Sequence, residues 1–231
     1  MNRRTLLSLL LISLGFGLAL PSSLTAADPT PQKILFLGNS ITKHGPKADI
    51  GWTGNWGMAA SAEDKDYVHL VTKGLTKTDT PAPQTFVQNI AEFERNYATF
   101  DLAAKLKDAA NFAPTLIVLA IGENVPALKT DEEKALFTKQ VTSLLTTLKG
   151  SASPKIIVRS SFWQNAAKDQ CLKQACDAVG GTYVDITGFD KVEANYARSE
   201  RPFKNEGVAR HPGDRGMQAI ADAIVKAASQ P

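Results

Sequence analysis

Short apolar runs that alternate with amphipathic segments are the feature that most constrains how this chain can fold. The apolar runs are residues 33–37, 85–87, 115–121, 155–158 and 182–186. Helical spacing of apolar residues marks residues 67–75, 97–109, 131–148, 167–179 and 214–228. Apolar runs without polar alternation suit strands that are buried on both faces of a parallel sheet. The pattern predicts an α/β, three-layer, flavodoxin-like domain, in which a five-stranded parallel sheet of order 2-1-3-4-5 carries helices on both faces.

The N-terminus has the pattern of a secretory signal peptide. Arg3 and Arg4 give it a basic start, residues 6–20 are apolar and uncharged, and small residues follow up to Ala27. The apolar run is too short to favour a permanent membrane span. We expect residues 1–27 to be a signal peptide and residues 28–231 to form a single domain. The mature protein would then be secreted or periplasmic, with no stable membrane span after cleavage.

The charge of the chain argues against a nucleic-acid partner. The formal net charge is +3, and removal of Arg3 and Arg4 leaves +1, because residues 1–27 contain no Asp or Glu. The remaining sequence has no cluster of Lys and Arg that could follow a phosphate backbone. We therefore expect the partner to be a small molecule or a glycan.

Two cysteines, Cys171 and Cys176, lie five positions apart in the segment with helical spacing at 167–179. Within one regular helix they would point to different faces and could not bond without distortion. If Cys171 instead preceded the helix, a local disulfide would be possible. The sequence leaves these two alternatives open.

Polar residues follow the ends of the predicted strands, where the functional crevice of an open α/β sheet lies. Ser40 follows the first strand, Asn124 follows the third, and His211 lies just before the last helix. A neutral imidazole can activate a serine hydroxyl near pH 7, and an amide can donate to an oxyanion. Each residue alone also suits a turn or a helix cap. Together they predict a nucleophilic serine centre.

These motifs resemble three sequence blocks of the SGNH (GDSL-like) hydrolases, many of which are carbohydrate esterases. The sequences Gly-Asn-Ser at 38–40, Gly-Glu-Asn at 122–124 and His-Pro at 211–212 match in order and spacing. The resemblance implies Ser40 as nucleophile and oxyanion donor, Asn124 as side-chain oxyanion donor and His211 as general base. It also implies that the protein needs no metal or organic cofactor.

The sequence departs from the family pattern at three places. Asn39 stands where the family usually has Asp, and Val208 stands where the family's catalytic acid lies, three positions before the histidine. Either a backbone carbonyl orients His211 in a Ser-His dyad, or another carboxylate does so. The first candidate for such a carboxylate is Glu123, and weaker candidates are Glu206 and Asp214. The segment after the second strand also lacks the usual oxyanion glycine, a role for which we consider Gly57 and Gly54.

Three tryptophans suggest a sugar-binding surface. Trp52 and Trp56 lie in a Gly-rich loop after the nucleophile, and Trp163 follows the fourth strand. Such rings can stack on sugars, although Trp52 and Trp56 could equally be buried anchors of the loop. We therefore expect an exported serine esterase that hydrolyses small acyl esters, O-acetyl groups on carbohydrate above all. The alternatives are a catalytically impaired carbohydrate-binding protein of this fold and an acyltransferase.

Overall fold

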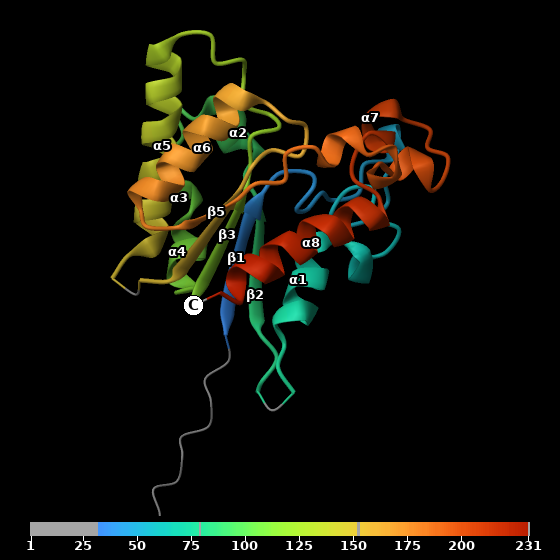
Figure 1. Ribbon diagram of the computed structural model, residues 1–231, viewed down its shortest axis with the longest axis horizontal. Coiled ribbons are helices and arrows are strands. Elements are labelled where there is room, and N and C mark those ends of the chain that lie inside the picture. The colour runs from blue at the N-terminus through green and yellow to red at the C-terminus, as the bar shows by residue number, and fades with distance from the viewer. Residues whose placement is uncertain (1–31, 79, 152, 231) are drawn as a thin grey trace, which may run out of the picture.

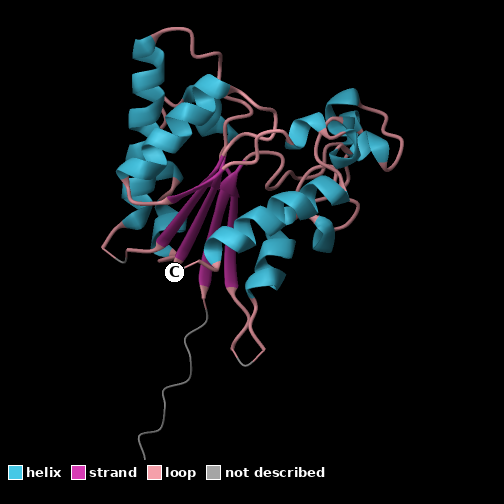
Figure 2. Ribbon diagram, in the orientation of Figure 1, coloured by secondary structure: helices cyan, strands magenta, loops and turns pink. Residues whose placement is uncertain are grey.

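A single five-stranded sheet organises the residues that the computed structural model describes, which are 32–78, 80–151 and 153–230 (Figures 1 and 2). Its strands run in the order β2-β1-β3-β4-β5, and every neighbouring pair is parallel. The strands are β1 (Lys33–Gly38), β2 (Gln84–Asn89), β3 (Leu116–Ala120), β4 (Lys155–Arg159) and β5 (Thr182–Val184). The predicted fold class and strand order are confirmed. Because all strands are parallel, their carboxyl ends meet at one edge.

Helices connect the strands and cover both faces of the sheet. The α-helices are α1 (Tyr67–Leu75), α2 (Ala91–Asn96), α3 (Leu102–Lys105), α4 (Lys107–Asn111), α5 (Asp131–Lys149), α6 (Ala166–Ala178), α7 (Glu206–Ala209) and α8 (Asp214–Ala228). Short 3-10 turns occupy Ala48–Ile50, Glu63–Lys65, Phe189–Lys191, Glu193–Asn195 and Ala197–Ser199. Side chains set several helix starts: Asp66 caps α1, and Thr130 with Glu133 forms a capping box on α5.

The single helix predicted over residues 97–109 is wrong. Asn89 Oδ1 accepts a hydrogen bond from the Ala91 N–H at 2.9 Å, so a helix begins directly after β2. Asp101 then caps a separate short helix, α3, by accepting from the Ala104 N–H. As a result α2 lies at the carboxyl edge of the sheet, where the sequence analysis placed no helix.

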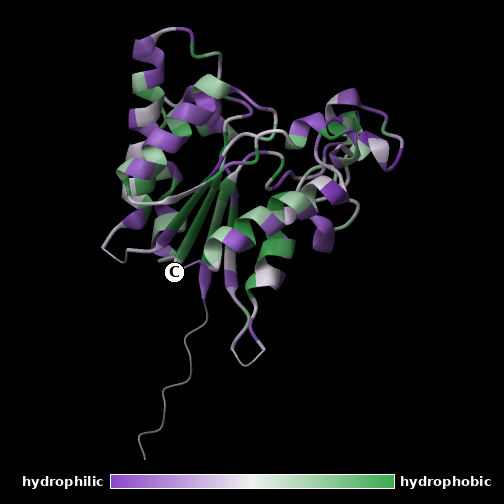
Figure 3. Ribbon diagram, viewed as in Figure 1, coloured by the Kyte–Doolittle hydropathy of each residue, from purple (hydrophilic) through white to green (hydrophobic). Residues whose placement is uncertain are grey.

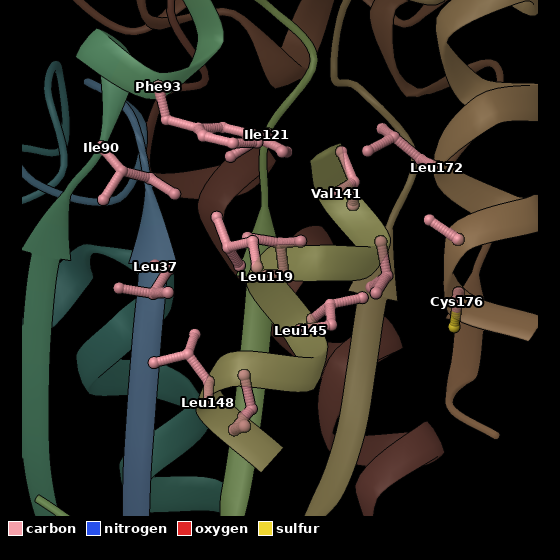
Figure 4. Close-up of a cluster of buried hydrophobic side chains, with 14 of the residues drawn as sticks. Leu37, Ile90, Phe93, Leu119, Ile121, Val141, Leu145, Leu148, Leu172 and Cys176 are labelled. Carbon is pink, nitrogen blue, oxygen red and sulfur yellow. The ribbon is translucent and has the colours of Figure 1, made fainter. Parts of the chain in front are cut away.

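The side chains of each strand alternate between two hydrophobic layers. Leu35 and Leu37 of β1 point into a core shared with α5 and α6, and Ile34 and Phe36 point into a core shared with α1 and α8. Figure 4 shows Leu37 in the first core, and Figure 3 shows hydrophobic colour along the strands between the helix layers. Burial on both faces explains why the strands lack polar alternation.

A third, smaller apolar cluster lies under two loop segments that we call the cap, residues 44–63 and 189–210. The cluster joins Trp52 and Met58 of the first segment to Ala197 and Val208 of the second. Figure 1 shows these segments side by side around α7, next to the α1 and α8 layer. Glu200 of the cap also accepts from the N–H groups of Asp214 and Arg215 at the start of α8. The cap therefore fixes the chain on both sides of His211.

Some sequence predictions are answered here and one lies outside the described residues. The predicted signal peptide, 1–27, falls within residues that the structure does not describe. Cys171 and Cys176 both lie in α6 as buried free thiols, so the disulfide alternative is wrong. No helix within residues 32–78, 80–151 or 153–230 is long and apolar enough to cross a membrane.

Candidate active site

Ser40 lies at the tight turn that follows β1. A side chain at Gly38 would place its Cβ 1.8 Å from Thr42 Oγ1 and 2.7 Å from the Ala120 carbonyl oxygen, so the turn requires glycine. The N–H groups of Thr42 and Lys43 both donate to the Asn39 carbonyl, which closes the turn. Ser40 is partly exposed at the carboxyl edge of the sheet, as the sequence analysis expected.

His211 meets Ser40 directly. Ser40 Oγ lies 2.8 Å from His211 Nε2, and His211 Nδ1 lies 2.7 Å from the Gly207 carbonyl oxygen. A carbonyl oxygen only accepts hydrogen bonds, so Nδ1 carries the proton and Nε2 is free to accept from the serine hydroxyl. Burial lowers the pKa of His211 to about 4, against the opposing effect of the Gly207 carbonyl. The imidazole is therefore neutral at pH 7, as a general base must be.

The three candidate carboxylates do not orient this imidazole. Glu123 is bonded to Asn39, Arg159 and the Phe162 N–H, while Nδ1 of His211 faces Gly207. Asp214 accepts from Ser61, and Glu206 is an exposed residue at the start of α7. The assignment of Glu123 as the orienting acid is therefore corrected. Of the two alternatives, the geometry matches the Ser-His dyad held by a backbone carbonyl.

Val208 shows why the usual acid is absent. Its side chain is 2% exposed and packs in the third apolar cluster with Trp52 and Met58. The same helical turn brings the His211 N–H onto the Val208 carbonyl and Nδ1 onto the Gly207 carbonyl. The backbone of α7 thus replaces the carboxylate as the group that positions the ring.

Asn124 is positioned by a buried glutamate that the sequence analysis missed. Glu94 of α2 accepts from Asn124 Nδ2 at 2.7 Å and from the N–H groups of Asn124 at 3.1 Å and Gly122 at 2.7 Å. Gly122 has a φ of 127°, a conformation open to glycine alone, which turns the chain after β3 toward Glu94. One hydrogen of the Asn124 amide remains to donate to an oxyanion.

Asn39 links Glu94 to the second buried glutamate. Its Nδ2 donates to Glu123 Oε2 at 2.7 Å and to Glu94 Oε1 at 3.2 Å. Glu123 also forms a buried ion pair with Arg159, 2.8 Å between Oε1 and Nη1. Burial alone would raise the pKa of Glu123, but Arg159 and the Phe162 N–H lower it; burial and the nearby Glu123 raise the pKa of Glu94. A donor thus lies between two carboxylates, a place that suits Asn better than the Asp of the SGNH sequence block that residues 38–40 resemble.

Two donors remain for an oxyanion. The Ser40 N–H makes no hydrogen bond to any described residue, and Ser40 lines the same cavity as Asn124. Gly57 is not a donor, because its N–H is bonded to Asp66 Oδ2 at 2.9 Å, and that assignment is corrected. Ala91, after β2, also lines the cavity, but its N–H already donates to Asn89 Oδ1 and is not free for an oxyanion. Gly54 packs against Trp52 and Trp56.

The tryptophans support the site rather than line it. Trp52 and Trp56 meet edge to face, 5.7 Å between ring centres, and their indole N–H groups donate to the carbonyls of His44 and Ala60. They anchor the loop, which corrects their assignment as sugar platforms. Trp163 packs edge to face on His211 at 5.4 Å, so its ring braces the imidazole; its role in sugar binding stays a prediction.

A cavity of about 330 Å³ opens over Ser40, Asn124 and His211. The cap contributes Met58, Asn205 and Val208 to its wall, and α2 contributes Ala91 and Arg95. Three residues important for this geometry escaped the sequence analysis: Glu94, Arg159 and Arg95. Arg159 could have been found from the sequence, because it is a charged residue at the end of an apolar strand, at the sheet edge where functional sites lie. Glu94 and Arg95 left none, because they look like surface residues of a short polar helix.

Comparison with known proteins finds solved structures of similar fold but no match by sequence. No protein-family model and no curated protein sequence matches the chain. Among solved structures, a protein described as a GDSL-like lipase from Bacteroides uniformis superposes with a TM-score of 0.53 and 11% identity, covering 86% of this chain and 96% of that one. A carbohydrate esterase reported to have divergent catalytic and non-catalytic binding functions gives 0.56 and 14%, covering 89% and 67%. TesA gives 0.54 and 13%, covering 86% and 98%.

Proposed function

We propose that this chain, which has the fold of the SGNH (GDSL-like) hydrolases, is a serine esterase that removes small acyl groups from hydroxyls. The observation that carries the proposal is the pair of contacts at His211: Nε2 at 2.8 Å from Ser40 Oγ and Nδ1 at 2.7 Å from the Gly207 carbonyl oxygen. These contacts fix the ring, its tautomer and the atom that receives the serine proton.

Acylation would begin with attack of Ser40 Oγ on the ester carbonyl carbon. His211 Nε2 takes the hydroxyl proton as the new C–O bond forms, and the carbonyl oxygen becomes an oxyanion between the Ser40 N–H and the Asn124 amide. The bond to the alcohol then breaks, and His211 returns the proton to the leaving oxygen. The Gly207 carbonyl stabilises the imidazolium through Nδ1–H, and it does so without the full charge of a carboxylate.

Deacylation would repeat the sequence with water. His211 Nε2 removes a proton from water as the water oxygen attacks the acyl carbon, and the proton passes to Ser40 Oγ as that bond breaks. The products are the free acid and the restored serine. One imidazole thus accepts and returns the proton in both steps.

The size of the cavity and the fold comparison support short acyl groups on carbohydrate. About 330 Å³ holds an acetylated sugar ring but leaves little room for a long acyl chain. A carbohydrate esterase is among the structural neighbours. Export by residues 1–27 is part of the proposal and is tested by N-terminal sequencing of protein recovered outside the cytoplasm.

The test is hydrolysis of p-nitrophenyl acetate and of an O-acetylated sugar. The wild type should turn over both, whereas Ser40→Ala and His211→Gln should lose at least about 10³-fold in kcat. Ser229→Ala, a matched change at the exposed end of α8, should keep wild-type rates. Equal rates in wild type and Ser40→Ala would refute the proposal.

No carboxylate of a described residue contacts His211 Nδ1, and this observation favours a second candidate function, a sugar-binding protein that has lost catalysis. It predicts binding of the acetylated sugar by wild-type protein with no acetate release. Labelling of Ser40 by an organophosphonate separates the two, because labelling requires an activated hydroxyl. An acyltransferase would instead label and then pass the acetyl group to an added sugar, which product analysis detects.

A further inference from the structure

Charge is distributed unevenly around the cavity over Ser40. Among the described residues that line it there is no Asp or Glu, and Arg95 is the one that carries a permanent positive charge. The nearest buried carboxylates, Glu94 and Glu123, are held behind Asn124 and Asn39 by the hydrogen bonds described above. The cavity wall therefore carries a positive charge, although residues 28–231 have a formal net charge of only +1.

Arg95 is free to bind a ligand. Its side chain is exposed, and no described carboxylate forms an ion pair with it. Glu92, one turn earlier in α2, is paired with Lys105 instead, 3.0 Å between Nζ and Oε2. Arg95 Nη2 lies 3.5 Å from Asn124 Oδ1, a distance too long for a strong hydrogen bond. The guanidinium thus lies beside the proposed oxyanion donor, with this one long contact to Asn124 and no other hydrogen bond from its side chain to a described residue.

We infer that Arg95 binds a carboxylate on the substrate, so that the site prefers acetyl esters of uronic acids over those of neutral sugars. This inference rests on the proposed esterase function and assigns its substrate class. A guanidinium fork binds a carboxylate through two parallel hydrogen bonds. Arg95 and Asn124 line the same cavity with 3.5 Å between Nη2 and Oδ1, so a carboxylate on a sugar whose ester carbonyl binds at Asn124 would lie on the side of the guanidinium.

The experiment compares two esters that differ only at one carbon: a mono-O-acetyl methyl galacturonide, with a free carboxylate, and the matching mono-O-acetyl methyl galactoside. The wild type should favour the galacturonide in kcat/KM, and Arg95→Gln should lower that preference about tenfold, because one exposed charged hydrogen-bond pair is lost. Arg95→Lys should retain part of the preference. Arg215→Gln removes the same charge from an exposed residue of α8 outside the cavity and should change nothing.

The readouts separate this inference from the function on which it rests. If Arg95→Gln slows both esters equally, Arg95 acts on the transition state and the inference is overturned. If the wild type hydrolyses p-nitrophenyl acetate but treats the two sugars alike, the inference is overturned and the esterase proposal stands. If the wild type hydrolyses none of the three esters, both fail.

Discussion

Replacing Asn39 by Asp should be among the most damaging single-atom changes that this protein can undergo. The change exchanges an amide nitrogen for an oxygen at a fully buried position. That nitrogen donates to Glu123 at 2.7 Å and to Glu94 at 3.2 Å, so the variant would bring three carboxyl groups together with Arg159 as their single buried cation. Aspartate is nevertheless the usual residue in the SGNH sequence block that residues 38–40 resemble.

The size of the effect follows from the protonation that would relieve the repulsion. The folded variant can keep one extra proton on the cluster, which leaves an O–H to replace one of the two lost donor contacts. Holding a proton at pH 7 on a carboxyl whose ordinary pKa is about 4 costs about 4 kcal/mol, and about 1.4 kcal/mol at pH 5. The loss in unfolding free energy should therefore approach 4 kcal/mol at pH 7 and shrink as the pH falls.

Urea unfolding at pH 7 and pH 5 measures this directly, with wild type and Asn39→Asp compared at each pH. Asn55→Asp makes the same chemical change on the exposed loop and should alter stability by less than about 0.5 kcal/mol. A loss that is the same at both pH values would point to packing instead of charge. No loss at pH 7 would show that the donor between the two glutamates is dispensable.

Two further predictions concern His211. Because burial lowers its pKa to about 4 and the neutral ring is the base, kcat/KM should persist as the pH falls through 6.5 and drop with a midpoint near 4; an acid limb centred at 6.5 contradicts this. Between pH 6.5 and pH 4 the unfolded state binds a proton that the folded state does not, so lowering the pH through this interval should decrease the free energy of unfolding by about 3 kcal/mol through this residue, a decrease that urea unfolding should not find in His211→Gln. Val208→Asp places an acid three positions before His211, as in the SGNH sequence block. It should lower the melting temperature, because the carboxylate would enter an apolar cluster, and raise kcat less than twofold, because Nδ1 is already bonded. A tenfold gain in kcat would refute the backbone-held dyad.

The fold could be predicted from the sequence because the three central strands, β1, β3 and β4, are buried on both faces. Residues 33–37 and 115–121 have no polar alternation, and that pattern leaves few architectures open. The segment after β2 was assigned wrongly for a local reason. No side chain caps α2 at Ile90; the Asn89 side chain, at the last residue of the strand, instead accepts from the Ala91 N–H, and an Asn after an apolar run indicates a turn as readily as a helix start.

The site residues that could be predicted from the sequence differ from those that could not in where their partners lie. Ser40, Asn124 and His211 were predictable because parallel strands bring the residues after them to one edge. The groups that hold these three residues in place were not predictable from the sequence. Glu94 looks like a surface residue, since charged side chains are almost never fully buried unless paired, and its partners lie 28 and 30 positions away on another strand end.

The group that orients His211 has no sequence signature, because any residue at position 207 would offer the same carbonyl. The sequence shows only the effect of this contact on the neighbouring position 208. Once a backbone carbonyl occupies Nδ1, position 208 is released from carrying an acid and can pack against Trp52 in the cap. Likewise, once Glu94 enters behind Asn124, position 39 must donate and cannot be an acid. The residues at 39 and 208, which differ from the SGNH sequence blocks that the motifs resemble, thus each fit a local structure that the sequence does not reveal: a buried glutamate behind Asn39 and a backbone carbonyl at His211 Nδ1.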